Sequence, residues 1–188
     1  MKSAFRKINP KELQFNPFTL IVKDWFLVTA GPPDSFNTLT AGWGGLGVLW
    51  NKDVVMIVIR PTRYTYEFLE SNDTFTCAFF ENEHKRALQL LGQKSGRDGD
   101  KVAESGLTPI PGMLEGTTSF AEAHMVMECR KIYFQDLDPT RFLDPLVDTQ
   151  WYPEKDYHRM YVGEIVNCLV KPPVRGRHKL VNPEDSGE

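Results

Sequence analysis

The chain has 188 residues, and 41% of them are hydrophobic, which suits one domain, or one domain with modest additions, around a packed core. Its 22 basic and 25 acidic residues give a formal charge of −3, which argues against a general nucleic-acid-binding protein. No apolar run of signal-peptide length follows the N-terminus, and none approaches the roughly 20 residues of a membrane span. We therefore expect a cytoplasmic protein with neither a nucleic acid nor a membrane as partner.

The pattern of apolar residues predicts more strands than helices. Residues 1–17 are expected to form an N-terminal arm, residues 18–171 a domain and residues 172–188 a peripheral C-terminal tail. Strands are predicted, in chain order, at Thr19–Thr29, Asn37–Val48, Val54–Ile59, Thr74–Phe80, Phe120–Phe134 and Met160–Val170. Helices are predicted at Thr65–Ser71, at His84–Leu91 with Gly96 as the C-cap, and within Pro139–Trp151. Because strands and helices do not alternate strictly, we expect a mainly β fold with helices, a largely antiparallel β-barrel rather than a doubly wound sheet.

A literal GxGxxG motif at Gly42–Gly47 does not predict a dinucleotide-binding fingerprint. That motif binds a dinucleotide where a strand precedes it and a helix follows it. Here a short apolar run and the turn Asn51-Lys52-Asp53 follow, which leaves no room for a helix before the strand at Val54. We interpret the glycines as positions where a flat ligand or a second backbone approaches the strand closely.

Two segments suit the two ends of a planar, phosphorylated ligand. Asn37–Gly44 combines hydroxyl side chains, backbone amides and the aromatic Trp43, a mixture that a flavin ring needs for stacking and hydrogen bonds. The alternative is an ordinary strand rich in Thr and Gly with a core tryptophan. Arg60–Thr65 places two arginines and two threonines at a predicted helix N-terminus, which favours phosphate. The alternative is capping by Thr62 or Thr65 with solvated arginines.

Two further segments have both a structural and a functional interpretation. Lys94–Lys101 is either a helix C-terminus followed by a polar loop or a second cationic lobe around the same phosphate. His158 precedes the last predicted strand. It is either a structural or exposed histidine, or a group that hydrogen-bonds the flavin or helps to place a nicotinamide.

The sequence shows no nucleophile with a base and an orienting group. The three cysteines are far apart and odd in number, so they outline no disulfide framework, and the histidines lack metal-ligand spacing. No metal site is predicted. An enzyme without such groups is easier to explain if a cofactor performs the difficult step, and a flavin accepts hydride and passes single electrons.

In their order and spacing, these four segments resemble the flavin reductase-like family of FMN-binding split barrels, and its flavoredoxin branch above all. The resemblance is carried by Asn37–Trp43, Arg60–Thr65 and Lys94–Lys101, with His158–Ile165 added, and runs from about Phe18 to Val170. It implies that residues 18–171 form a six-stranded antiparallel split β-barrel of Greek-key type. It also implies a homodimer with FMN at the subunit interface.

The resemblance implies roles for individual residues as well. Those expected along the isoalloxazine ring and ribityl chain are Asn37, Thr38, Thr40, Ala41 and Trp43. Those expected at the phosphate end are Arg60, Arg63, Tyr64 and Thr65, with Ser95, Lys101, Lys94 and Arg97 as further contacts. His158 is the candidate for a catalytic or nicotinamide-positioning role. Many relatives carry Asp-His at this point, whereas here Tyr157 precedes the histidine and Asp156 lies one position further back.

Three functions are compatible with these segments. The first is an NADH- or NADPH-dependent oxidoreductase that moves electrons through FMN to free flavin or another acceptor. The second is a flavoredoxin-type electron carrier that holds FMN tightly, turns over little NAD(P)H and exchanges electrons with a redox protein partner. The third is a module that binds a phosphorylated ligand without redox chemistry.

Overall fold

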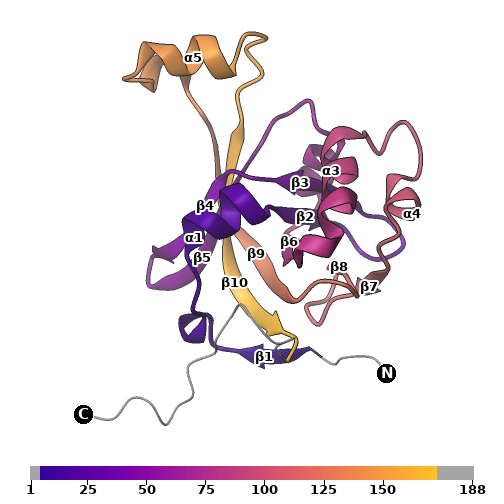
Figure 1. Ribbon diagram of the computed structural model, residues 1–188. Helices are drawn as coiled ribbons and strands as arrows, with labels where there is room; N and C mark the ends of the chain where they lie inside the picture. Colours follow the sequence, from indigo (N-terminus) through magenta and orange to yellow (C-terminus); the bar gives the residue numbers. More distant parts are fainter. Residues whose placement is uncertain (1–4, 173–188) are drawn as a thin grey trace.

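The structure, a computed structural model, describes residues 5–172 of the chain (Figure 1). All but the first residue of the C-terminal tail expected at 172–188 lies outside the described residues. The predicted N-terminal arm contributes β1 (Arg6–Ile8), which pairs with the last strand, and a helical turn at Pro10–Glu12. Within residues 5–172, no helix is long and apolar enough to cross a membrane.

Strand β10 (Arg159–Val170) organises the main sheet because it pairs with β9, β5 and β1, always antiparallel. The sheet has eight strands in the order β3-β2-β6-β9-β10-β5-β4, with β1 on β10. Its other strands are β2 (Phe26–Ala30), β3 (Asn37–Ala41), β4 (Gly44–Leu49), β5 (Lys52–Ile59), β6 (Thr74–Phe79) and β9 (Met125–Asp136). A two-stranded sheet pairs β7 (Pro109–Pro111) with β8 (Thr118–Phe120). The main sheet therefore has more strands than the six that the resemblance implied, because β1 joins it and the segment 37–48 forms two strands.

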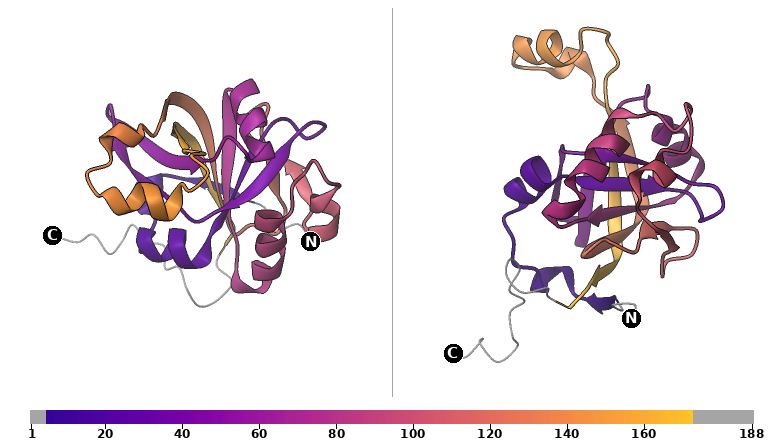
Figure 2. Two further views of the ribbon diagram at one scale, coloured as in Figure 1. Left: turned by 90° about the horizontal axis from the view of Figure 1, so that it is seen from above. Right: turned by 45° about the vertical axis from the view of Figure 1, so that its right-hand side comes forward.

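Short helices cover the sheet and connect its strands (Figure 1). They are α1 (Pro17–Thr19), α2 (Tyr64–Ser71), α3 (Lys85–Gln93), α4 (Lys101–Ser105) and α5 (Pro145–Trp151), with single turns at Leu20–Asp24, Asn82–His84 and Pro139–Arg141. α5 belongs to residues 137–158, which leave the barrel between β9 and β10 and stand away from the sheet in Figure 1 and in the right-hand view of Figure 2. We call residues 137–158 the projecting segment.

Strand β2 is buried along its whole length because both of its faces are covered. Successive strand residues point to opposite faces. Phe26 accordingly packs in the larger core cluster, where its ring stacks on a neighbouring aromatic ring and where Phe75 also lies. The next residue, Leu27, packs in a second cluster with Leu88 and Leu91 of α3. The apolar stripe of α3 thus covers the outer face of the sheet, as its periodicity predicts.

The prediction of a strand over Thr19–Thr29 is wrong in its first half. The side chain of Asn16 accepts hydrogen bonds from the amides of Phe18 and Thr19 at 3.0 and 3.3 Å, and Pro17 occupies the first helical position. This capping starts a helix that continues to Asp24, despite the β-branched residues within it. The strand β2 begins only after Trp25, whose φ of 62° breaks the chain direction.

Two other expectations also differ from the structure. The segment Asn37–Val48 is interrupted at Gly42-Trp43, where β3 ends and β4 begins. Gly96 is not a helix C-cap, because α3 ends at Gln93 and Lys94 follows as its cap. Gly96 instead lies against Asn37, where a Cβ would stand 2.4 Å from the amide oxygen of that residue.

We expect Gly163→Ala to lower the free energy of unfolding by about 1–3 kcal/mol, the usual cost of overpacking a core. Gly163 lies at an irregularity of the β9–β10 register, and a Cβ there would stand 2.5 Å from Phe75 Cζ and 2.9 Å from Cys129 Cβ. Urea denaturation measures the change. The matched control is Gly47→Ala, because nothing lies within 4 Å of the added Cβ. Equal stability of the two variants would contradict this close packing at Gly163.

Candidate functional site

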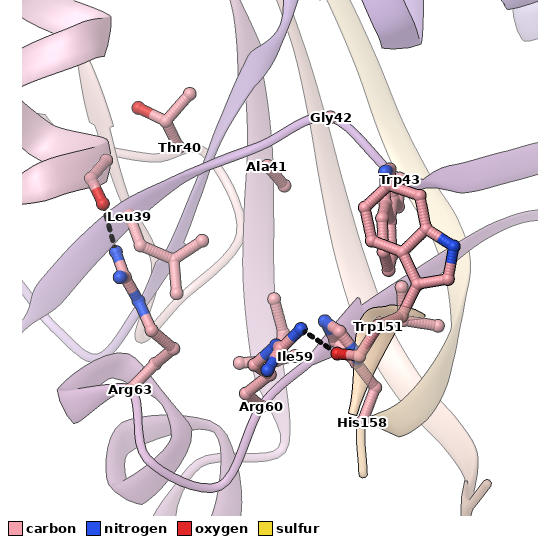
Figure 3. Close-up of a pocket in the computed structure, with 12 residues that line it drawn as sticks. Leu39, Thr40, Ala41, Gly42, Trp43, Ile59, Arg60, Arg63, Trp151 and His158 are labelled. Atoms are coloured by element: carbon pink, nitrogen blue, oxygen red, sulfur yellow. Dashed lines mark hydrogen bonds between the residues drawn. The ribbon is translucent and has the colours of Figure 1, made fainter. Parts of the chain in front are cut away.

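The candidate ligand site is a cleft of about 320 Å³ where β3 and β5 end and the projecting segment returns to the barrel (Figure 3). Leu39–Trp43 supply one wall from β3 and the bend after it, and Val58–Arg60 supply another from the end of β5 and the residue after it. Arg63, Gly92 of α3, and Trp151 and His158 of the projecting segment complete the lining. The register of β10 on β5 places Arg159 opposite Ile59, so that Arg60 and His158 come together although they are distant in sequence.

The bend at Gly42-Trp43 explains the GxGxxG motif. Gly44 has a φ of 150°, and a Cβ there would stand 2.4 Å from the carbonyl oxygen of Met56 on β5. β4 follows the bend at once and pairs with β5, so no helix is present for a dinucleotide phosphate. Gly44 thus serves the close approach of a second backbone, as the sequence predicts, and at the bend Trp43 lines the cleft (Figure 3).

Aromatic rings form one side of the cleft. The ring of Trp43 lies 5.0 Å from that of Trp151, edge to face at 82°, and 5.2 Å from that of His158. His158 is buried, and its Nδ1 lies 2.8 Å from the hydroxyl of Tyr152. Burial, and then the nearby charge of Arg60, lowers the pKa of His158 to about 4. His158 is therefore a neutral hydrogen-bonding group at neutral pH rather than a cation.

A second, smaller pocket of about 60 Å³ adjoins the cleft at the start of α2, and Leu39 and Arg63 line both. The β-branched run of β5 stops before Pro61, and Arg63 is the N-cap of α2. The amides of Tyr64 and Thr65 in the first helical turn have no intrahelical partner, so they favour an anion here. The loop after α3 closes the pocket, since Gly96 allows it to pack on Asn37 and Tyr64.

Two cations stand in this pocket without a carboxylate partner in the part of the chain that the structure describes. Arg63 donates to the carbonyl of Gly92, and Lys101, only 3% exposed, donates to the carbonyls of Leu91 and Lys94, both at 3.1 Å. Burial, and then the repulsion of Arg60, lowers the pKa of Arg63. Burial, and then the repulsion of Arg63, lowers the pKa of Lys101 to about 8. An anion between them would relieve both costs.

The other predicted cations already have carboxylate partners. Lys94 pairs with Glu104. Arg97 pairs with Glu67, and its guanidinium lies 4.7 Å from the ring centre of Tyr64. Arg60 donates to both carboxylate oxygens of Asp156 at 2.6 and 2.8 Å. These three side chains fasten loops and the projecting segment to the barrel.

The remaining predicted residues divide between the two pockets and the interior. Thr40 and Ala41 line the cleft, and the hydroxyl of Thr40 donates to the carbonyl of Leu88. Those lining the small pocket are Tyr64, Thr65, Lys94 and Ser95, besides Arg63 and Lys101. Asn37 is buried and donates to the hydroxyl of Thr65 at 2.9 Å. Thr38 is buried, and its hydroxyl donates to the carbonyl of Val28 at 3.1 Å.

Gly92 and Trp151 line the cleft but were not among the residues predicted from the sequence. Gly92 lies inside α3, where glycine lowers the stability of a helix by about 1 kcal/mol relative to alanine. A glycine in a predicted helix is the sequence signal that could have indicated a close contact there. A Cβ there would stand 3.1 Å from the Cβ of Thr40, so the glycine lets α3 approach β3. No local sequence pattern indicates that Trp151 lines the cleft, because its position depends on the path of the projecting segment. Within residues 5–172, no group of three or more His, Cys, Asp or Glu side chains could hold a metal ion.

Residues 21–182 match the family model of the flavin reductase-like domain. One similar solved structure is an FMN-binding domain of a flavin reductase-like enzyme from Shewanella baltica (TM-score 0.66, 14% identity, covering 91% of this chain and 79% of that one). Another is the flavoredoxin of Desulfovibrio vulgaris (0.61, 21%, 90% and 89%). A third is the NADH:FAD oxidoreductase SgcE6 of Streptomyces globisporus (0.61, 17%, 85% and 86%). A search of curated proteins gave no match. The expected mainly β, antiparallel split-barrel class is confirmed.

We expect the small pocket to bind sulfate, with an affinity that falls above pH 8. Sulfate keeps its charge over this range, whereas Lys101 loses its proton as the pH rises through its pKa of about 8. One linked proton predicts a loss of about tenfold per pH unit above that value. Isothermal titration calorimetry between pH 6.5 and 9.5 measures it. Lys101→Met should bind sulfate weakly with no such slope, and an unchanged slope in that variant would exclude Lys101.

Proposed function

This chain belongs to the flavin reductase-like family, and from that premise we propose that it is an FMN-binding oxidoreductase that takes electrons from NADH or NADPH and passes them to an acceptor. The observation that carries the proposal is the sharing of one cleft by Trp43 and Arg63. A planar ring and its phosphate need an aromatic slot and a cationic pocket within the length of one ligand. Separate sites for these two residues would have contradicted it.

The donor chemistry of the site fits FMN. The volume of the cleft lies at the lower end of the range for small-molecule sites. Its walls are apolar, with few polar groups. The adjoining pocket offers two cations that lack a carboxylate partner within residues 5–172, beside the first turn of α2. When bound, FMN supplies hydride and single-electron transfer, which these side chains do not provide themselves.

The residues of the chain then have distinct tasks. Arg63 and Lys101 hold the phosphate, with the amides of Tyr64 and Thr65 as added donors. Thr40, Ala41 and the bend at Gly42-Trp43 border the ring. Asn37 supports the small pocket through its hydrogen bond to Thr65. The hydroxyl of Thr38 bonds to β2 in the interior, so Thr38 supports β3 and does not contact the ligand through that hydroxyl. His158, neutral at neutral pH, offers a hydrogen bond and no charge beside the ring.

We extend the proposal to a homodimer with FMN near the subunit interface. Exposed apolar side chains gather on the β4–β5 hairpin and the adjacent end of β9, where Trp50 lies edge to face on Tyr133 at 5.9 Å and Val48 and Phe134 are also exposed. Exposed apolar side chains of this kind favour association. Light scattering coupled to gel filtration measures the mass, and a monomer at micromolar concentration would contradict this extension.

The visible spectrum of the purified protein tests the main proposal. We expect a yellow protein, or one that becomes yellow on incubation with FMN, and bleaching of the flavin by NADH or NADPH under anaerobic conditions. Rapid steady-state oxidation of either nucleotide with free flavin present identifies an oxidoreductase. Bound flavin that titrates but turns over poorly with both nucleotides identifies an electron carrier of the flavoredoxin type. A protein that stays colourless with FMN would support a non-redox module instead.

We expect Arg63→Ala to weaken FMN binding by about 1.5–3 kcal/mol, the scale of a hydrogen bond to a charged group. Quenching of flavin fluorescence measures the dissociation constant. Arg86→Ala is the matched control, because Arg86 is an exposed arginine on α3 outside the lining of the cleft. Equal affinities of the two variants would remove Arg63 from the site.

A further inference from the structure

The projecting segment has its own small core. The amide of Leu137 donates to the carbonyl of His158 at 2.9 Å and closes its base. The rings of Phe142 and Tyr152 stack at 5.8 Å and 11°, and Tyr157 packs on both. Beyond its base, the segment therefore keeps its shape by itself and needs a separate device to fix its position against the barrel.

Arg60 provides that device through three interactions of one guanidinium. Its Nη1 donates to both carboxylate oxygens of Asp156, its Nη2 donates to the carbonyl of Trp151 at 2.6 Å, and its Cζ lies 5.3 Å from the ring centre of Tyr152. A planar fork of donors can make such a set, whereas a lysine ammonium has no matching geometry. The pair is partly buried, and Arg60 lowers the pKa of Asp156.

This anchor includes the backbone of Trp151. The carbonyl that Arg60 binds belongs to the same residue whose ring meets Trp43 edge to face, and the two rings line the cleft together (Figure 3). We propose that Arg60 is a positioning residue that holds the projecting segment through Asp156 and Trp151, and so builds the aromatic wall of the cleft. The inference rests on the proposed flavin site. It gives Arg60 a structural role and leaves the phosphate to Arg63 and Lys101.

The geometry supports this assignment over a direct phosphate contact. A phosphate at Arg60 would have to displace Asp156 from a two-oxygen contact and leave a carboxylate beside the new anion. The guanidinium of Arg63, by contrast, has only a carbonyl as its hydrogen-bond partner among the described residues. Arg60 lines the cleft but not the small pocket, whereas Arg63 lines both.

The test uses the full-length chain and the variants Arg60→Ala, Asp156→Asn and the double variant. Two tryptophan rings at 5.0 Å give an exciton couplet in far-ultraviolet circular dichroism. The couplet is recorded without flavin, so it is independent of whether FMN binds. Trp151→Leu assigns the couplet, and thermal melting of each variant confirms that the barrel folds. FMN dissociation constants are measured alongside.

Positioning predicts that Arg60→Ala loses most of the couplet and that Asp156→Asn, which keeps the bond from Arg60 to the Trp151 carbonyl, loses part of it. FMN binding weakens in the same order, and the double variant behaves like Arg60→Ala alone. An unchanged couplet in either variant overturns the inference. It is also overturned if Arg60→Ala weakens FMN binding by about tenfold or more, the size of one charged hydrogen bond, while Asp156→Asn leaves FMN binding unchanged. If Arg60→Ala does not fold, Asp156→Asn carries the test alone.

Discussion

The pairing of β10 with β5 is the constraint on which the site depends. Six residue pairs set this register, from Arg159 against Ile59 to Glu164 against Val54. Because side chains alternate across a strand, a shift by one residue would turn Tyr161 and the rest of the buried set away from the core. The same register fixes the strand ends, and with them the meeting of Arg60 and His158. The cleft is therefore a consequence of the way the barrel closes.

Much of the fold can be predicted from local patterns in the sequence. The continuous β-branched run of β5, the apolar stripe of α3 and the helix at Tyr64–Ser71 are each encoded within a few residues. The prediction of a strand from Thr19 is wrong because residues outside that segment determine its conformation. There a capping asparagine and a proline, two residues outside the apolar run, decide the conformation of the residues after them.

The site could be predicted only in part. Arginines and lysines could be gathered around an expected phosphate, because charge is visible in the residue types. The sequence could not show that Glu67, Glu104 and Asp156 neutralise three of these cations, since those partners come from other elements. Nor could it show the burial of Lys101, which depends on how the loop after α3 folds back. The structure thus reduces the candidate phosphate-binding cations from a broad basic cluster to Arg63 and Lys101.

The burial of the cysteines has a practical consequence. Cys77, Cys129 and Cys168 are all free thiols within the core, each at most 1% exposed. Maleimide reagents need an accessible thiolate, so the native cysteines should not react during site-directed labelling. A cysteine introduced at Leu143, which is 99% exposed on the projecting segment, would take a single fluorophore or spin label. Such a probe would report the position of that segment in solution without any native thiol having to be removed.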